Sequence, residues 1–479
     1  MRLERATAEA RRAVAVVERS RSWVPSLAAP VRSKFLAEGK EASAGIGRLA
    51  EAMRTAPEFL GAKGRKVWFL AIQNGAELRA TGGFIGAFGI LEADAGAIRL
   101  TRLDPDTKLP KLDSPVESAA LSDRYDTFGS RKLWENVNMT PDFPSAAATM
   151  AQMWEKGTGQ RIDGVIAIDV VALAHLLKVT GPVGIPSLGV AADSRNVASL
   201  LLSDAYSSLP TRDIRQAALV EVGRKTWERL YAGLDSKTVP ALKALGAAAS
   251  GKHLIVWSRD HQQFIDGLGL SGRLKEGAGI RPGTDYLMVV GQNAAASKMD
   301  FHSRRRLSYR VRLDEQGVAH SSLRVTMRNE ASAGGVSDYV QGPLNAPGFN
   351  RTYLSAYLPA GVRIDSARLN GQESQFESDT EKGLRVASRL FDIGPGGTAH
   401  MDLSMRRKLY PDAALPGKRT YRLVLQAQPS LHADDLDVTI ELPKGFAATG
   451  AAGGLEGGDR IFRYRGRLSA DRQLVVHYS

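Results

Sequence analysis

The sequence predicts an α/β domain followed by all-β material, and three observations support this fold class. Up to about residue 300, short apolar runs of strand length alternate with helical patterns. Beyond that point, segments of strand length alternate apolar and polar residues and are separated by Gly and Pro. The length of 479 residues exceeds one ordinary core, so we expect several domains.

Residues 1–62 are expected to form an N-terminal helical stalk or packing segment. Phe35, Ile46, Leu49 and Met53 fall at helical spacing with charged residues between them. A membrane-surface helix is the less favoured interpretation of the same pattern.

The α/β domain is expected over residues 63–300. Strand, helix, strand and helix follow one another there, which predicts a mixed sheet with helices on its faces. The strands and helices that define this pattern are expected at residues 67–72, 82–91, 97–103, 144–156, 165–168 and 170–178. Residues 301–410 are then expected to form a β-sandwich domain, and residues 411–479 a small β module.

Composition limits the classes of function. The formal net charge of +13 predicts attraction to polyanions such as an anionic envelope polymer or a polyprenyl-phosphate glycan. Few basic residues are interleaved with aromatic ones, so no nucleic-acid partner is expected. Cys is absent, which is compatible with an oxidising compartment. No run approaches the roughly 20 apolar residues of a membrane helix, so a membrane tether is expected upstream of residue 1.

The segment from Gln73 to Gly83 carries the densest set of polar groups. It follows an apolar strand and contains an amide pair, Glu77, Arg79, Thr81 and two glycines. A guanidinium fork suits phosphate, and glycines let backbone N–H groups approach an anion. A tight turn whose polar groups satisfy one another explains the same residues equally well.

Two further sets of residues extend this candidate site. The strand ending at Gln292 and Asn293 repeats the Gln-Asn ending of the earlier strand, and ligands of open α/β sheets bind beyond such carboxyl ends. Asp104 and Asp106 end another strand, where they would hold Mg²⁺ or cap a turn. The side chains that we expect to contact ligand are those of Gln73, Asn74, Glu77, Thr81, Gly82, Gly83, Asn138, Asn293 and Lys298.

Several ordered motifs resemble the bacterial domain-of-unknown-function family numbered 4012. The motifs are residues 73–86, Pro141-Asp142-Phe143-Pro144, residues 163–169 and the Thr180-Gly181-Pro182-Val183 segment. The α/β core in turn looks like the LytR-CpsA-Psr fold, whose members transfer polyprenyl-pyrophosphate-linked glycopolymers to the cell wall. By this resemblance Arg79 would bind pyrophosphate, and Asp104 or Asp106 would lie near Mg²⁺.

Two functional interpretations therefore stay open. In the first, a membrane-tethered cell-envelope protein binds or transfers a polyprenyl-phosphate-linked glycan, with Arg79, Asp104 and Asp106 as its catalytic residues. In the second, a non-catalytic extracytoplasmic scaffold or binding protein serves cell-surface polysaccharide assembly. The transferases carry an Arg in the turn where this chain has Asp104-Pro105-Asp106, a difference that favours the second interpretation.

Overall fold

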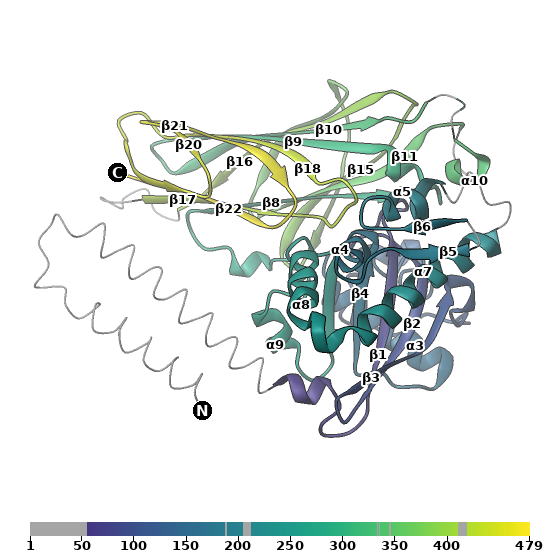
Figure 1. Cartoon of the computed structure of the whole chain (residues 1–479). Coiled ribbons are helices and arrows are strands. Elements are labelled where there is room, and N and C mark those ends of the chain that lie inside the picture. The colour runs from purple at the N-terminus through teal and green to yellow at the C-terminus, as the bar shows by residue number, and fades with distance from the viewer. Residues whose placement is uncertain are drawn as a thin grey trace, which may run out of the picture.

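The computed structural model describes residues 55–186, 189–204, 212–332, 334, 336–343, 346–410 and 419–479. They form an α/β unit with a β-sandwich lying across one end of it (Figure 1). The expected fold class is confirmed, with helices and a mixed sheet first and predominantly strands afterwards. A helical segment was expected over residues 1–62, and its residues 1–54 lie outside the described residues.

The α/β unit is built on a five-stranded sheet of order β3-β2-β1-β4-β7. Strands β1 and β4 are parallel, whereas β2 and β7 run antiparallel to their neighbours. The strands are β1 (Lys66–Asn74), β2 (Phe84–Asp94), β3 (Ala97–Pro105), β4 (Gly164–Asp169) and β7 (Leu254–Ser258), with β5 (Val183–Ile185) and β6 (Val190–Ala192) as a separate hairpin. The helices are α3 (Phe143–Thr158), α4 (Val170–Thr180), α5 (Val197–Ser199), α7 (Arg212–Ala232), α8 (Leu234–Ser250) and α9 (Gln262–Gly267).

Strand β1 is buried on both faces, which explains its continuous apolar sequence. Phe69 belongs to the core shared with α3, whereas Trp68 and Leu70 pack on the opposite side with Trp227 of α7. In the part of the chain that the structure describes, no helix is long and apolar enough to cross a lipid bilayer.

The motif at residues 163–169 fastens β4 to β1. The Asp163 carboxylate accepts hydrogen bonds from the Val67 backbone at 2.8 Å and from Lys66 Nζ at 3.0 Å. A Cβ on Gly164 would lie 2.2 Å from the Trp68 ring, so only glycine fits beside the indole. Asp169 caps α4 by accepting from the Val171 and Ala172 amides.

The sandwich consists of an eight-stranded and a seven-stranded sheet. The first contains, in spatial order, β13 (Gln372–Glu373), β12 (Arg363–Leu369), β16 (Thr398–Lys408), β10 (Val318–Asn329), β9 (Ser303–Leu313), β18 (Asp434–Glu441), β21 (Ile461–Leu468) and β20 (Glu456–Gly458). The second contains β14 (Glu377–Glu381), β15 (Leu384–Ile393), β11 (Asn350–Leu358), β8 (Thr284–Asn293), β17 (Arg419–Gln426), β22 (Arg472–Tyr478) and β19 (Ala448–Ala452). One short helix, α10 (Asp338–Gln341), lies among these strands in the sequence.

The pairing of the strands does not follow the domain boundaries expected at residues 300 and 410. Strand β8 belongs to the sandwich, where it lies between β11 and β17. Strands from residues 419–478 pair within the same two sheets as the earlier ones and form no module of their own. Every residue of β8 is buried, so its sequence resembles that of a core strand in an α/β sheet.

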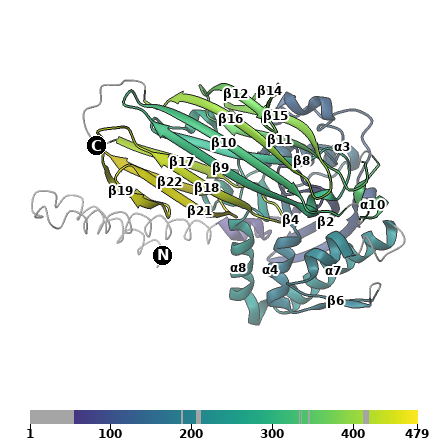
Figure 2. The ribbon, with the colours of Figure 1, turned by 90° about the horizontal axis from the view of Figure 1, so that it is seen from above.

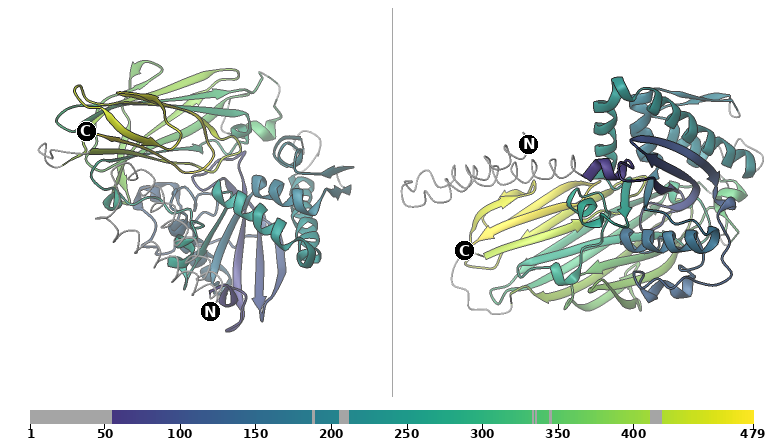
Figure 3. Two further views of the ribbon diagram at one scale, coloured as in Figure 1. Left: turned by 60° about the vertical axis from the view of Figure 1, so that its left-hand side comes forward. Right: turned by 90° about the horizontal axis from the view of Figure 1, so that it is seen from below.

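The two sheets have different surroundings. The seven-stranded sheet faces the α/β unit, because Met288 and Val290 of β8 pack against Ala80 and Leu274. The eight-stranded sheet lies on the far side, and Figure 2 shows its strands from above. Figure 3 shows the sandwich and the α/β unit from two further directions. The sandwich therefore has one covered face and one uncovered face.

Replacing Gly164 by Ala is expected to destabilise the α/β unit by about 1–3 kcal/mol, because the new methyl group overlaps the Trp68 ring. Gly246→Ala in α8 is the matched control, since a Cβ there meets no atom within 4 Å. The control should be neutral or stabilising by up to about 1 kcal/mol. Thermal unfolding of both variants checks this, and equal midpoints would contradict the packing argument.

Candidate functional site

The segment after β1 is a tight loop that returns the chain to β2. Asn74 Oδ1 accepts a hydrogen bond from the Ala76 amide at 3.0 Å, and the Phe84 amide donates to the Glu77 carbonyl at 2.8 Å. Gly83 has φ +158, and a Cβ on it would lie 2.2 Å from the Asn74 carbonyl oxygen. The closure of the turn therefore explains this glycine without a bound anion.

Arg79 lies at the centre of the loop and is 7% exposed. Its guanidinium donates to three backbone carbonyls, those of Glu135 at 3.0 Å and of Leu78 and Asn293 at 3.1 Å each. Nη2 also reaches Asn136 Oδ1 at 3.4 Å. Burial lowers the pKa of Arg79, and neighbouring carboxylates oppose that effect. The fork expected to hold phosphate is occupied by the protein itself.

The end of β8 at Asn293 meets the loop that follows Gln73 and Asn74, at a direct contact between the α/β unit and the sandwich. The Asn293 amide donates to the Leu78 carbonyl at 2.9 Å. Asp300 Oδ2 accepts from the Leu78 amide at 3.0 Å and from Asn293 Nδ2 at 2.8 Å. Burial raises the pKa of Asp300, although its hydrogen bonds oppose this shift. We call this set of contacts around Arg79 the junction network.

The remaining predicted ligand contacts belong to the junction network. Gln73 Nε2 donates to Thr81 Oγ1 at 2.9 Å, and Asn138 Nδ2 donates to the same oxygen at 3.1 Å and to the Gly83 carbonyl at 2.8 Å. A Cβ on Gly82 would lie 2.5 Å from Gln73 Oε1. Asn138 Oδ1 is buried with no donor among the described residues, a situation that ordered water usually resolves.

Lys298 and Glu77 form a buried ion pair in the junction network. The Lys298 ammonium also lies 4.8 Å from the centroid of the Tyr339 ring, a cation–π distance. Each charge is thus balanced locally, as burial of an ion requires.

Sequence reasoning missed three members of the junction network, Gln428, Arg305 and Asp434. Gln428 Nε2 donates to the Arg79 carbonyl at 3.0 Å, and its Oε1 accepts from Arg305 Nη1 at 3.0 Å. Arg305 in turn donates to both carboxylate oxygens of Asp434 at 2.7 and 2.8 Å. The sequence did contain a clue to Arg305. It lies at an inward position of β9, where the alternation of apolar and polar residues predicts an apolar side chain.

Asp104 and Asp106 are not part of the junction network. Asp104 pairs with Arg102 on its own strand at 2.5 Å, and Asp106 begins the 3₁₀ turn η3 (Asp106–Lys108). Within the described residues no group of three or more acidic, His or Cys side chains is placed to hold a metal ion. Mg²⁺ at this position would take its other ligands from phosphate or water.

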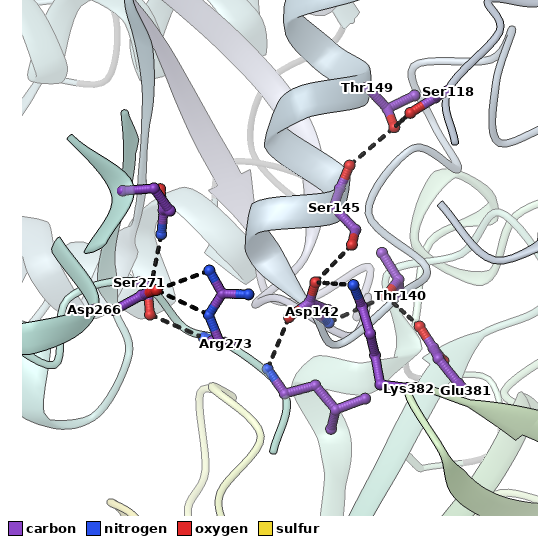
Figure 4. Close-up of polar contacts among 12 residues, drawn as sticks. Ser118, Thr140, Asp142, Ser145, Thr149, Asp266, Ser271, Arg273, Glu381 and Lys382 are labelled. Atoms are coloured by element: carbon purple, nitrogen blue, oxygen red, sulfur yellow. Dashed lines mark hydrogen bonds and ion pairs between the residues drawn. The ribbon is translucent and has the colours of Figure 1, made fainter. Parts of the chain in front are cut away.

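The Pro141-to-Pro144 motif forms a second contact with the sandwich (Figure 4). Asp142 occupies the N-cap position of α3 but makes no side-chain cap bond. Its carboxylate accepts from Ser145 Oγ at 2.5 Å and from the Leu274 amide at 3.0 Å, and it lies 3.5 Å from Lys382 Nζ. Thr140 Oγ1 donates to Glu381, the residue that precedes Lys382 in the turn between β14 and β15.

Lys252 makes a third contact with the sandwich, and His253 beside it bonds within the α/β unit. Lys252 Nζ pairs with Asp471 at 2.5 Å and donates to the Ala427 carbonyl at 3.0 Å. His253 Nδ1 lies 2.6 Å from Asp169 Oδ2. Burial lowers the pKa of His253, but its charge interaction and hydrogen bond with Asp169 outweigh burial, so the net shift is upward.

The space beside the junction network is small. A cavity of about 30 Å³ lies against Leu78, Asp300, Arg305 and His432. That volume holds one or two water molecules and no pyrophosphate group. The arrangement is therefore suited to holding two domains together.

Comparisons with known proteins give one family. The family model described as "Protein of unknown function (DUF4012)" matches residues 63–206. No curated protein matches the sequence.

Solved structures give only weak likenesses. A Legionella pneumophila protein described as nutrient-binding is 11% identical, with 40% of this chain and 70% of that one covered and a TM-score of 0.26. An M1 zinc metallopeptidase of Deinococcus radiodurans is 13% identical, with 36% and 42% covered and a TM-score of 0.22. A yeast LTA4 hydrolase is 7% identical, with 37% and 29% covered and a TM-score of 0.21. This chain spans less than half the length of the last two, and TM-scores this low carry no argument.

Arg79→Ala is expected to lower the free energy of unfolding by about 3–5 kcal/mol, because it leaves buried carbonyls and acids without their cation. Arg79→Lys should not restore stability, since one ammonium cannot reach carbonyls from three chain segments. Urea unfolding measures both. The exposed Arg161→Ala is the control and should change stability by less than about 0.5 kcal/mol. Equal stability of Arg79→Ala and the control would contradict the structural role.

The free energy of unfolding is expected to fall as pH rises past neutrality, because His253 loses its proton. Its folded-state pKa lies above its ordinary value of 6.5, so protonated His253 stabilises the fold fully below that pH. This contribution is lost as pH rises through the raised folded-state pKa. Thermal midpoints of wild type and His253→Gln across this range test it. The difference between the two should shrink with rising pH, and a constant difference would refute the linkage.

Proposed function

We propose that this chain, whose residues 63–206 belong to the family of unknown function DUF4012, is a non-catalytic binding protein of cell-surface polysaccharide assembly. Its site of action is the bacterial cell envelope, outside the cytoplasm, and its partner is an anionic envelope polymer. Glycopolymer phosphotransfer is the interpretation that this proposal replaces.

The observation that carries the proposal is the environment of Arg79. A phosphoryl-transfer site needs cationic donors that are free to meet charge developing on the substrate. The Arg79 guanidinium instead donates to the Glu135, Leu78 and Asn293 carbonyls inside a buried contact. Exposing it to a pyrophosphate would require separating the sandwich from the α/β unit.

Two further features support a binding role. Asp104, the expected Mg²⁺ ligand, pairs with Arg102 and lies on β3, which β2 separates from β1. The net charge of +13 attracts the molecule to polyanions, and this attraction requires no catalytic group.

The test compares two ligands, polyprenyl pyrophosphate and the acidic polysaccharide polygalacturonate. Wild type should bind polygalacturonate equally well with Mg²⁺ or with EDTA, and Asp104→Asn combined with Asp106→Asn should bind as wild type does. Titration calorimetry measures both affinities. Polyprenyl pyrophosphate should show no Mg²⁺-dependent binding. Tight Mg²⁺-dependent binding that the double variant loses would overturn the proposal in favour of phosphotransfer.

A further inference from the structure

The uncovered face of the eight-stranded sheet is rich in arginine. Along β9, Leu307, Tyr309 and Val311 point into the sandwich core and are buried, whereas Arg310 and Arg312 between and beyond them are exposed. Side chains alternate across a strand, so the basic residues project together on the side away from the α/β unit. We call this surface, formed by the outward side chains of β21, β18, β9, β10, β16 and β12, the arginine face.

Strand register aligns one row of short polar and basic side chains across the whole arginine face. In spatial order the row contains Arg463, Thr439, Arg310, Ser322, Ser404 and Ser366. These six positions hold no carboxylate, and Glu456 of β20 continues the row beyond Arg463. Five strand spacings give it a length of about 24 Å. Its side chains therefore form a band across the strands with arginine at two points.

The rows on either side are taller and mixed in charge. One contains Arg465, Asp437, Ser308, Arg324, Asp402 and Arg368, in which the acids are paired with arginines. The other contains Arg312, which faces His320 and Glu441 across the strands. The short side chains of the central row thus lie lower than the arginines beside them. A depression of about 470 Å³ lies over the part of these rows formed by β9, β10, β16 and β12, lined by Ser308, Arg310, Ser322, Arg324, Arg368 and Ser404 together with Asp402.

Several exposed arginines of this face form no ion pair. Among the described residues no carboxylate lies within ion-pair distance of Arg310, Arg312, Arg328 or Arg463, although Glu441 faces Arg312 and Glu456 faces Arg463 across the strands. Exposed like charges at neighbouring strand positions repel one another, so an anion lying between them would stabilise the face.

We propose that the arginine face binds a linear anionic polysaccharide, which lies along the central row and places its acidic groups against Arg310 and Arg463. This inference rests on the proposed function and adds the site and the chemistry of the ligand. Guanidinium forks match carboxylate or phosphate groups, and Ser and Thr hydroxyls bond sugar hydroxyls between them. Arg310 and Arg463 are two strand spacings apart, about 10 Å, which suits charges that repeat along a polymer.

A polysaccharide fits this face better than a nucleic acid does. Along these six described strands no Phe, Tyr or Trp points outward, so the bases of a single strand have no ring on which to stack. Among the described residues the face is also a sheet surface without a projecting helix or ribbon that could enter a duplex groove.

The experiment uses the full chain and measures binding of fluorescent polygalacturonate by anisotropy. The test variant is Arg310→Gln with Arg463→Gln. The matched control is Arg99→Gln with Arg161→Gln, which removes the same charge from exposed positions of the α/β unit. Loss of two charge-assisted contacts should weaken binding by at least about tenfold, whereas the control should change it less than about twofold. Neutral dextran and single-stranded DNA are the comparison ligands.

Each outcome decides the inference. Weakened binding by the test variant alone, with dextran unbound and DNA bound less tightly than polygalacturonate, supports it. Equal binding by the two double variants overturns the arginine face as the site while leaving a polysaccharide-binding function standing. Tighter binding of DNA than of polygalacturonate overturns the choice of ligand. Absence of any polygalacturonate binding by wild type overturns both this inference and the proposed function.

Discussion

A buried guanidinium must have its donors met, because an unpaired charge inside a protein costs several kilocalories per mole. Arg79 meets this requirement with carbonyls of Leu78, Glu135 and Asn293, which come from three separate parts of the chain. The α/β loop, the segment before α3 and the end of β8 are therefore held at one point. Gln428 extends the same contact to Arg305 and Asp434 inside the sandwich.

This constraint fixes which surfaces remain accessible. Ligands of open α/β sheets bind beyond the carboxyl ends of the strands, and here the sandwich packs against the carboxyl end of β1. The Asp142 and Lys252 contacts hold the same two units together at other places. The far face of the sandwich takes no part in any of these contacts. The motif residues therefore hold the sandwich in place on the α/β unit.

The family motifs acquire a structural meaning from this arrangement. Gly164 makes room for the Trp68 ring, Asp163 ties β4 to β1, and Asp142 joins α3 to the sandwich turn. Residues of the kind that bind phosphate in other proteins here bind backbone. Donor-rich side chains satisfy carbonyls and phosphate oxygens by the same geometry, so residue type alone does not separate the two roles.

The sequence alone determined the order of strands and helices, the mixed α/β sheet and the following sandwich, because hydrophobic period and turn residues are local signals. It also indicated that the Gln73-to-Gly83 and Gln292-to-Lys298 segments belong together. Only the tertiary structure decided that β8 lies in the sandwich, since a strand buried on both faces has the same apolar sequence whether a helix or another domain covers it. Tertiary structure also decided the role of Arg79, because its carbonyl partners lie up to 214 residues away and no local pattern identifies them.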